Sequence, residues 1–287
     1  MKKMVEESVQ ARRKILEARK PKFQRFDSPT IPGVEANYGG AVSSGGGIAP
    51  IEPTDPFSTF SMYFDNGTAG NSVVVGGGGS LNITDNLSIS VWVKPDSTLA
   101  PGGPYGIIDK APGSGNSGYS ITHHTGDGWR FTVGNGASTV ANFVVPNTDW
   151  QHLVGTYDSG TGNVLLYHNG LLVDTKNTGG GALTNSGNDL SIGAGHTSGT
   201  SEFAGFIDEA AIWNTTLSVV EIQAIYNLGC PDDLASKYVG EVGWWRMGED
   251  ATFLGGTWTI PNMFNPGTND GTSTTLPETD RRTVVPC

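Results

Sequence analysis

The acidic side chains that could catalyse hydrolysis are few and poorly spaced. Glu202, Asp208 and Glu209 are the nearest group of carboxylates along the chain. Hydrolysis of a glycosidic bond needs two carboxyl groups, one on each side of the bond. Asp208 and Glu209 are neighbours in a segment with the pattern of a β-strand, where successive side chains point to opposite faces. We therefore expect that these two carboxylates cannot flank one bond.

Other catalytic and metal-binding patterns do not occur in the sequence. It contains no Gly-x-Ser-x-Gly elbow and no phosphate loop ending in Gly-Lys-Ser/Thr, and the glycine run at 76–79 is typical of a turn. His123 and His124 are adjacent on a predicted strand, so they cannot chelate one metal as a simple pair. We expect a protein that is not an enzyme. A glycoside hydrolase remains the remote alternative.

Charge is divided unevenly along the chain. Residues 1–27 hold nine Lys/Arg and four Asp/Glu, a net charge of +5, and the remaining 260 residues hold eight basic and 24 acidic residues, a net charge of −16. The acidic body would repel phosphate, which argues against specific nucleic-acid binding. The basic segment favours docking on an acidic partner.

Residues 1–56 predict an arm rather than a folded domain. Apolar residues recur at helical spacing over 1–20, and Pro21 ends that pattern. Six prolines and a Ser/Gly run in 21–56 indicate a linker. Two interpretations of the helix stay open, a solvated tail and a docking arm that orders on a partner. The docking interpretation uses Val5, Val9, Arg12, Arg13 and Leu16.

The sequence predicts neither export nor membrane insertion. No apolar stretch follows Met1, Lys2 and Lys3, so a secretory signal peptide is not expected. No run approaches the roughly 18 apolar residues of a membrane-spanning helix. We expect synthesis in a cytoplasm without an export signal.

Residues 57–229 have the composition and pattern of an all-β domain. Gly makes up 42 of the 287 residues, about twice the usual share, as expected for many turns. Short alternating segments follow one another, and Asn169-Gly170 predicts a tight hairpin turn. Ser218 and Glu221 predict the capping box of one helix, which Gly229 ends. The predicted strands are 60–64, 88–94, 118–123, 129–133, 150–157, 164–168, 171–173, 189–193 and 205–213.

The order of these motifs resembles the laminin G-like, concanavalin A-like jelly-roll family. The resemblance covers about 170 residues and implies two antiparallel sheets packed face to face, usually with a binding role. The motifs that carry it are Phe64-Asp65-Asn66-Gly67, Leu87 to Pro95, Trp150 to Asp158, Leu166 to Gly170, Gly205 to Glu209 and Leu217 to Ile222.

The resemblance also implies candidate ligands. A structural calcium ion at the sandwich edge would use Asp65 and Asp208, although Asn66 stands where the family usually has Gly. The alternative is an Asx turn at Asp65 and a hydrogen-bonded buried carboxylate at Asp208. Carbohydrate binding is the family's commonest use, and sugars stack on exposed aromatic rings. The candidate rings are Tyr105, Trp129, Trp244, Trp245 and Trp258, with the core as the alternative place for Trp129.

Residues 230–287 predict an irregular C-terminal extension. The segment from Val242 to Glu249, followed by 269–272, is similar to a short segment that often leads into such jelly rolls. The arrangement is also similar to lectin-like proteins of marine bacteriophages. Cys230 and Cys287 could pair, but without an export signal free thiols are expected.

Together these observations favour a non-enzymatic structural protein of a virion. We expect a decoration or fibre-type component of a bacteriophage, found in the virion, that attaches through residues 1–56 and displays the jelly roll. Its expected partners are capsid or other virion proteins, host-surface glycans and further copies of the chain. A free or surface-attached carbohydrate-binding adhesin is the alternative.

Overall fold

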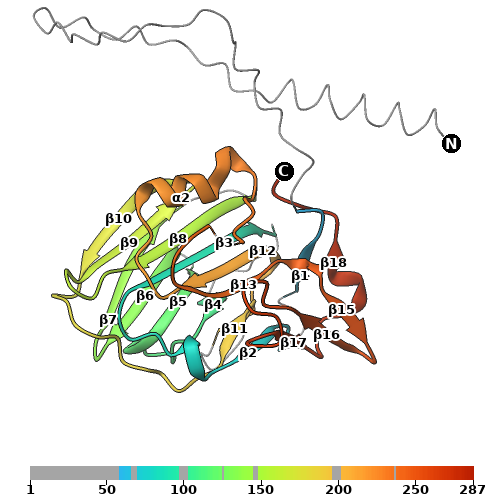
Figure 1. Ribbon diagram of the computed structural model, residues 1–287, viewed down its shortest axis with the longest axis horizontal. Helices are drawn as coiled ribbons and strands as arrows, with labels where there is room; N and C mark the ends of the chain where they lie inside the picture. The colour runs from blue at the N-terminus through green and yellow to red at the C-terminus, as the bar shows by residue number, and fades with distance from the viewer. Residues whose placement is uncertain are drawn as a thin grey trace, which may run out of the picture. The chain divides into compact units, whose positions relative to one another are not determined.

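The computed structural model describes residues 58–65, 70–96, 103–124, 126–144, 148–195, 202–235 and 237–287. They lie within one compact unit that spans 51–287 (Figure 1). The predicted docking residues of the arm, 5–16, lie outside the described residues. Among the described residues, no helix has the length and apolarity needed to cross a membrane.

Two antiparallel sheets form the body, which confirms the predicted jelly-roll sandwich. The first sheet has the order β10 (Leu171–Asn177), β9 (Asn163–His168), β8 (Gln151–Tyr157), β3 (Leu87–Pro95), β12 (Gly205–Trp213), β1 (Ser61–Phe64), β18 (Arg281–Arg282), and β13 (Glu241–Trp245) also pairs with β12. The second has the order β15 (Thr252–Leu254), β16 (Thr257–Ile260), β17 (Gly271–Ser273), β2 (Val73–Gly76), β11 (Leu190–Ile192), β4 (Tyr105–Asp109), β5 (Ser117–His124), β6 (Gly128–Asn135), β7 (Ser138–Phe143).

Alternation along the strands places the apolar residues between the two sheets. On β8, Leu153 and Tyr157 enter the main core, whereas Val154 faces the other way. The Asn169-Gly170 turn has positive φ at both residues, as a type I′ hairpin requires. At Gly155 a Cβ atom would lie 2.3 Å from the Phe131 ring of β6, so the sheets approach too closely there for any side chain.

A second apolar cluster covers the outer face of the first sheet. The helix α2 (Val219–Tyr226) begins at the predicted capping box, in which Ser218 and Glu221 bond each other's backbone N–H groups. It ends earlier than predicted, because Asn227 rather than Gly229 adopts the left-handed conformation that stops the helix. Its buried residues pack against Val154 and Trp213, so α2 lies along the outside of this sheet (Figure 1).

The C-terminal segment is regular rather than irregular, and it extends both sheets. β13 and β18 join the first sheet, β15 to β17 join the second, and β14 (Met247–Asp250) lies between them in sequence (Figure 1). Trp244, Trp245 and Trp258 are buried. This segment therefore belongs to the same hydrophobic core as the predicted domain.

Candidate functional site

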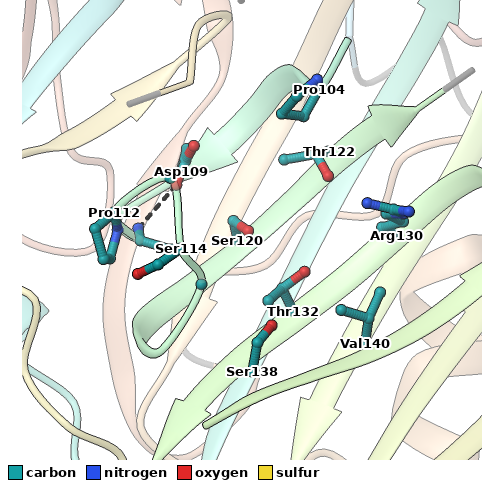
Figure 2. Close-up of a pocket in the computed structure, with 13 residues that line it drawn as sticks. Pro104, Asp109, Pro112, Ser114, Ser120, Thr122, Arg130, Thr132, Ser138 and Val140 are labelled. Atoms are coloured by element: carbon teal, nitrogen blue, oxygen red, sulfur yellow. Dashed lines mark hydrogen bonds between the residues drawn. The ribbon is translucent and has the colours of Figure 1, made fainter. Parts of the chain in front are cut away.

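The outer face of β4 to β7 carries a hollow lined mainly by small polar side chains. Strand register puts Asp109, Ser120, Thr132 and Val140 in one row across four strands. The residues between them in sequence, such as Ile121, point into the core instead. The hollow has a volume of about 160 Å³ (Figure 2). We call it the hydroxyl groove; its lining residues include Asp109, Ser120, Thr122, Arg130, Thr132 and Ser138.

A short turn after β4 forms one wall of the hydroxyl groove. Asp109 Oδ1 accepts a hydrogen bond from the Ala111 backbone N–H at 2.8 Å, and the Gly115 N–H donates to the Pro112 carbonyl at 2.8 Å. Gly115 has φ +66°, and a Cβ atom there would lie 2.7 Å from Ser138 Oγ. The turn is therefore folded tightly against the edge of the hydroxyl row.

Four side-chain hydroxyls line the groove: that of Ser138, which is exposed, and those of Ser120, Thr122 and Thr132, which are 4, 7 and 8% exposed. Within the described part of the chain, the side chains of Ser120, Thr122, Thr132 and Ser138 make no hydrogen bond to another residue, and three of them lie together in Figure 2. Arg130 adds a guanidinium group that forms an ion pair with Asp127. Burial lowers the pKa of Arg130. The groove thus offers hydroxyls between one carboxylate and one cation.

The structure corrects the aromatic candidates for sugar stacking. Tyr105 is 4% exposed and Trp129 is 1% exposed, so neither presents a ring face to solvent. Trp129 Nε1 instead donates to Gln151 Oε1 at 2.9 Å inside the sandwich. Trp129 and Phe131 lie on the same face of β6, and both belong to the main core, as the core interpretation predicts.

A second candidate group of side chains, all carboxylates, lies on β12 and β14. One carboxylate oxygen from each of Asp208, Glu209 and Glu249 lies within 4.8 Å of the others. This carboxylate cluster is buried at Asp208 and Glu209. Glu249 Oε2 is also buried and has no hydrogen-bond partner.

A β-bulge explains why neighbouring carboxylates meet, contrary to the sequence expectation. Glu209 has φ +48°, and the register between β12 and β3 shifts between Asp208 and Ala211. Consequently Ile207 and Ile212 both enter the main core, although five positions separate them. An odd spacing on one face requires an extra residue in the strand. That spacing was the sequence signal for the bulge.

Hydrogen bonds fix each member of the carboxylate cluster. Glu249 Oε1 accepts from the Phe60 backbone N–H at 2.7 Å. Asp208 Oδ2 accepts from Ser58 Oγ at 2.7 Å. Glu209 Oε2 accepts from Trp244 Nε1 at 2.6 Å, and its Oε1 faces Arg246 Nε at 3.2 Å. Burial, together with the charge of Glu209, raises the pKa of Asp208 well above its usual range. Burial raises the pKa of Glu209 to about 8, although Arg246 opposes the shift.

Asp65 does not join Asp208. Register pairs Met62 with Ile207, so Asp208 lies opposite Ser61, four residues from Asp65 along β1 and its extension. At about 3.3 Å per residue this separates the two by roughly 13 Å. The structure therefore brings Asp208 together with Glu209 and Glu249, and leaves Asp65 at the end of β1. Three carboxylates with an unpartnered buried oxygen fit the oxygen preference of calcium.

Comparison with known proteins agrees with this architecture. The family model of the concanavalin A-like lectin/glucanase superfamily matches residues 66–223. The chain belongs to this superfamily. No curated protein is similar to it in sequence.

Solved structures that resemble this superfamily member do so at low sequence identity. A candidate carbohydrate-binding protein from Bacteroides ovatus aligns with a TM-score of 0.56 and 14% identity, over 75% of this chain and 58% of that one. The binding domain of Paraclostridial Mosquitocidal Protein 1 aligns with a TM-score of 0.48 and 17% identity, over 58% of this chain and 43% of that one. The chain therefore spans less than two thirds of either protein.

Proposed function

We propose that the chain is a carbohydrate-binding protein and that the hydroxyl groove is its binding site. The observation that carries the proposal is the row of unpaired hydroxyls between Asp109 and Arg130 in a hollow of about 160 Å³. Sugar hydroxyls are donors and acceptors that such a row can bond at several points. The likeness of fold to a candidate carbohydrate-binding protein supports the proposal.

The groove favours weak binding of small polar units. Its volume is below the range of about 300–1,000 Å³ typical of drug-sized clefts, and its lining residues include no aromatic side chain. Binding would therefore rest on hydrogen bonds, each worth about 0.5–1.5 kcal/mol where both partners are neutral. Useful avidity then requires many copies held together.

We also propose that binding is not followed by hydrolysis. Asp109 is the one carboxylate among the residues that line the groove, whereas glycoside hydrolysis needs two. The carboxylate cluster is buried at Asp208 and Glu209, and a sugar could not reach it without opening the fold.

Glycan arrays followed by calorimetric titration test the binding proposal. Thr132→Val removes one hydroxyl at constant shape and should weaken binding roughly 3- to 10-fold. Asp109→Asn keeps the acceptor for the Ala111 N–H but removes the charge. Thr259→Val is the matched control, because Thr259 is an exposed strand residue of the same sheet on β16. Equal affinity of all variants would place the site elsewhere, and no binding to any glycan would refute the function.

We further propose that the protein is displayed on a virion, in many copies, through residues 1–56. The separation of a basic segment from an acidic body supports this proposal, as does the need of a weak site for avidity. Deleting residues 1–56 should leave the sandwich folded and abolish incorporation into particles. Incorporation at the wild-type level would show that this segment is not the anchor.

Finally, we propose that calcium binds the carboxylate cluster. The three carboxylates would bind calcium in their ionised form. The positive charge of the cation would then offset the repulsion between these buried negative charges. Adding a chelator should lower the melting temperature, since an ion that binds only the native state stabilises it. Glu249→Gln should abolish this response, whereas Glu241→Gln, an exposed residue on β13, should preserve it. A response lost in Asp65→Asn and kept in Glu249→Gln would move the ion to Asp65.

A further inference from the structure

A row of half-buried aromatic side chains crosses the outer face of the first sheet, beside α2. Register pairs Tyr63 on β1 with Phe206 on β12, and Phe206 with Lys94 on β3. The register of β3 and β8 extends by one pair to Lys94 and Trp150, the residue before β8. We call Tyr63, Phe206 and Trp150 the aromatic row, with Lys94 between the last two.

The aromatic row faces away from the core and is partly open to solvent. Its three members and Lys94 are all half-buried. The ring centroid of Phe206 lies 5.0 Å from that of Tyr63 and 6.2 Å from that of Trp150. The row crosses four neighbouring strands, a span of roughly 14 Å. The residues that alternate with it on β1, β3 and β12 belong to the main core: Met62, Phe64, Val93 and Ile207.

Charged groups of both signs border the aromatic row. The Arg282 guanidinium lies 4.7 Å from the centre of the Tyr63 ring and forms an ion pair with Asp280 at 3.3 Å. The Tyr63 hydroxyl donates to Asp96 Oδ2 at 3.1 Å. Lys94 adds an ammonium group from β3. Two cations and two carboxylates therefore surround the rings, which provides hydrogen-bond donors and acceptors without an excess of positive charge.

The end of α2 limits what can lie on the aromatic row. Trp92 precedes Lys94 by two residues on β3, so it is the next residue on the same face. Tyr226, the last residue of α2, stacks on Trp92 with ring centroids 5.8 Å apart. A helix with its side chains is about 10 Å across, so α2 forms a step beside the row. A flat protein surface could not pass this step to reach the rings, whereas a narrow chain could.

We propose that the aromatic row is a second carbohydrate site, which binds a neutral glycan chain lying across the strands. The inference rests on the proposed carbohydrate-binding function and adds a separate site to it. The C–H groups on one face of a sugar ring are apolar and pack against the electron-rich face of an aromatic ring. The sugar hydroxyls can then bond to Lys94, Arg282 and Asp96.

Charge favours a neutral glycan over an acidic one. The charges that border the aromatic row balance, and residues 28–287 together carry a net charge of −16, which would repel a polyanion. The row and the hydroxyl groove lie on the outer faces of different sheets of the sandwich. One copy of the chain would therefore hold two glycan chains, one on each face.

Fluorescence of Trp150 in the full-length protein tests the proposal. Six of the seven tryptophans, all within the described part of the chain, are at most 2% exposed, whereas Trp150 is half-buried. Acrylamide should therefore quench mainly Trp150, and Trp150→Phe should remove the quenchable component. The neutral probes are cellotetraose, maltotetraose, xylotetraose and mannotetraose, and tetragalacturonate is the acidic probe. We expect at least one neutral probe to protect Trp150 from acrylamide, and tetragalacturonate to leave the quenching unchanged.

Substitutions separate the aromatic row from the hydroxyl groove. Phe206→Ala should weaken binding of the protecting tetrasaccharide roughly 5- to 30-fold, as truncation of an aromatic anchor does. Phe253→Ala is the matched control and should bind as the wild type does, because Phe253 is a half-buried aromatic residue of the other sheet, on β15. Thr132→Val tests the groove alone and should leave the protection of Trp150 at saturating glycan unchanged.

The outcomes distinguish this inference from the proposed function. Glycan binding that Thr132→Val weakens, with Trp150 quenched as in the free protein, would overturn the second site and leave the groove in place. Protection of Trp150 without any effect of Thr132→Val would keep the second site and remove the groove. Absence of binding to any glycan would refute both. Quenching that falls as protein concentration rises, without glycan, would overturn the inference in favour of another copy of the chain on this face.

Discussion

His152 offers a direct test of how tightly the outer face of the first sheet is closed. Its ring has no exposed surface and packs against both Trp92 and Tyr226, with ring centroids 4.9 and 5.9 Å away. Ser90 Oγ lies 2.8 Å from His152 Nε2, and Nδ1 has no partner among the described residues. Burial, aided by the charge of His168, lowers the pKa of His152 to about 3.

The sign of the effect follows from linkage. In the unfolded chain the imidazole binds a proton below its ordinary pKa of 6.5, whereas in the folded protein it stays neutral down to about 3. The stability present above pH 6.5 is therefore lost as pH falls through this window. At pH 4.5, two units below 6.5, this amounts to about 2.7 kcal/mol.

Urea denaturation at pH 7.0 and pH 4.5 measures this loss. His152→Gln keeps a hydrogen-bonding partner for Ser90 but cannot titrate, so its unfolding free energy should change by about 2.7 kcal/mol less between the two pH values than that of the wild type. Val154→Ala is the control, because Val154 is buried on the same face of β8. It should destabilise the protein equally at both pH values. A glutamine variant with the wild-type pH dependence would refute the reasoning, as would an NMR titration of His152 near pH 6.5.

Three further predictions concern the core. Trp213→Ala should lower the unfolding free energy by about 3–5 kcal/mol, because Trp213 is fully buried. Trp150→Ala should lower it less, because Trp150 is half-buried. Equal losses of unfolding free energy for the two variants in denaturation curves would contradict this placement. Gly155→Ala should cost about 1–3 kcal/mol through overpacking, and Gly160→Ala, whose Cβ would find open space apart from one contact at 3.4 Å, should be near neutral in the same assay. Removing residues 241–287 should abolish cooperative thermal unfolding measured by circular dichroism, and a sharp transition in the truncated protein would show that the predicted domain folds without them.

The strands of the predicted domain can be predicted from the sequence, because the alternation of apolar and polar residues is visible within each short segment. Alternation over 205–213 predicts a strand, whereas its bulge has one sequence signal, the odd spacing of Ile207 and Ile212. A regular strand pattern does not predict the carboxylate cluster, because the cluster depends on this bulge. Glu249, its third member, lies 40 residues further along the chain, and only the pairing of sheet strands brings it close.

The C-terminal strands were harder to predict than the rest. β17 and β18 are three and two residues long and pair with β2 and β1 from the other end of the domain. A strand that short carries no visible alternation, so only its distant partner defines it. The hydroxyl groove was also invisible to pattern analysis, because Ser and Thr on exposed strand faces are common and only register aligns them.

The pairing of β1 with β18 also has a consequence for biosynthesis. Ser61 and its partner Arg282 are separated by roughly 220 residues. At a synthesis rate of about 5–20 residues per second, β1 waits roughly 10–45 s on the ribosome before its outer neighbour has been made. Until then the hydrogen-bonding edges of β1 and β2 remain open to other nascent chains. Newly made copies therefore pass through an interval in which their unpaired strand edges can pair with other chains.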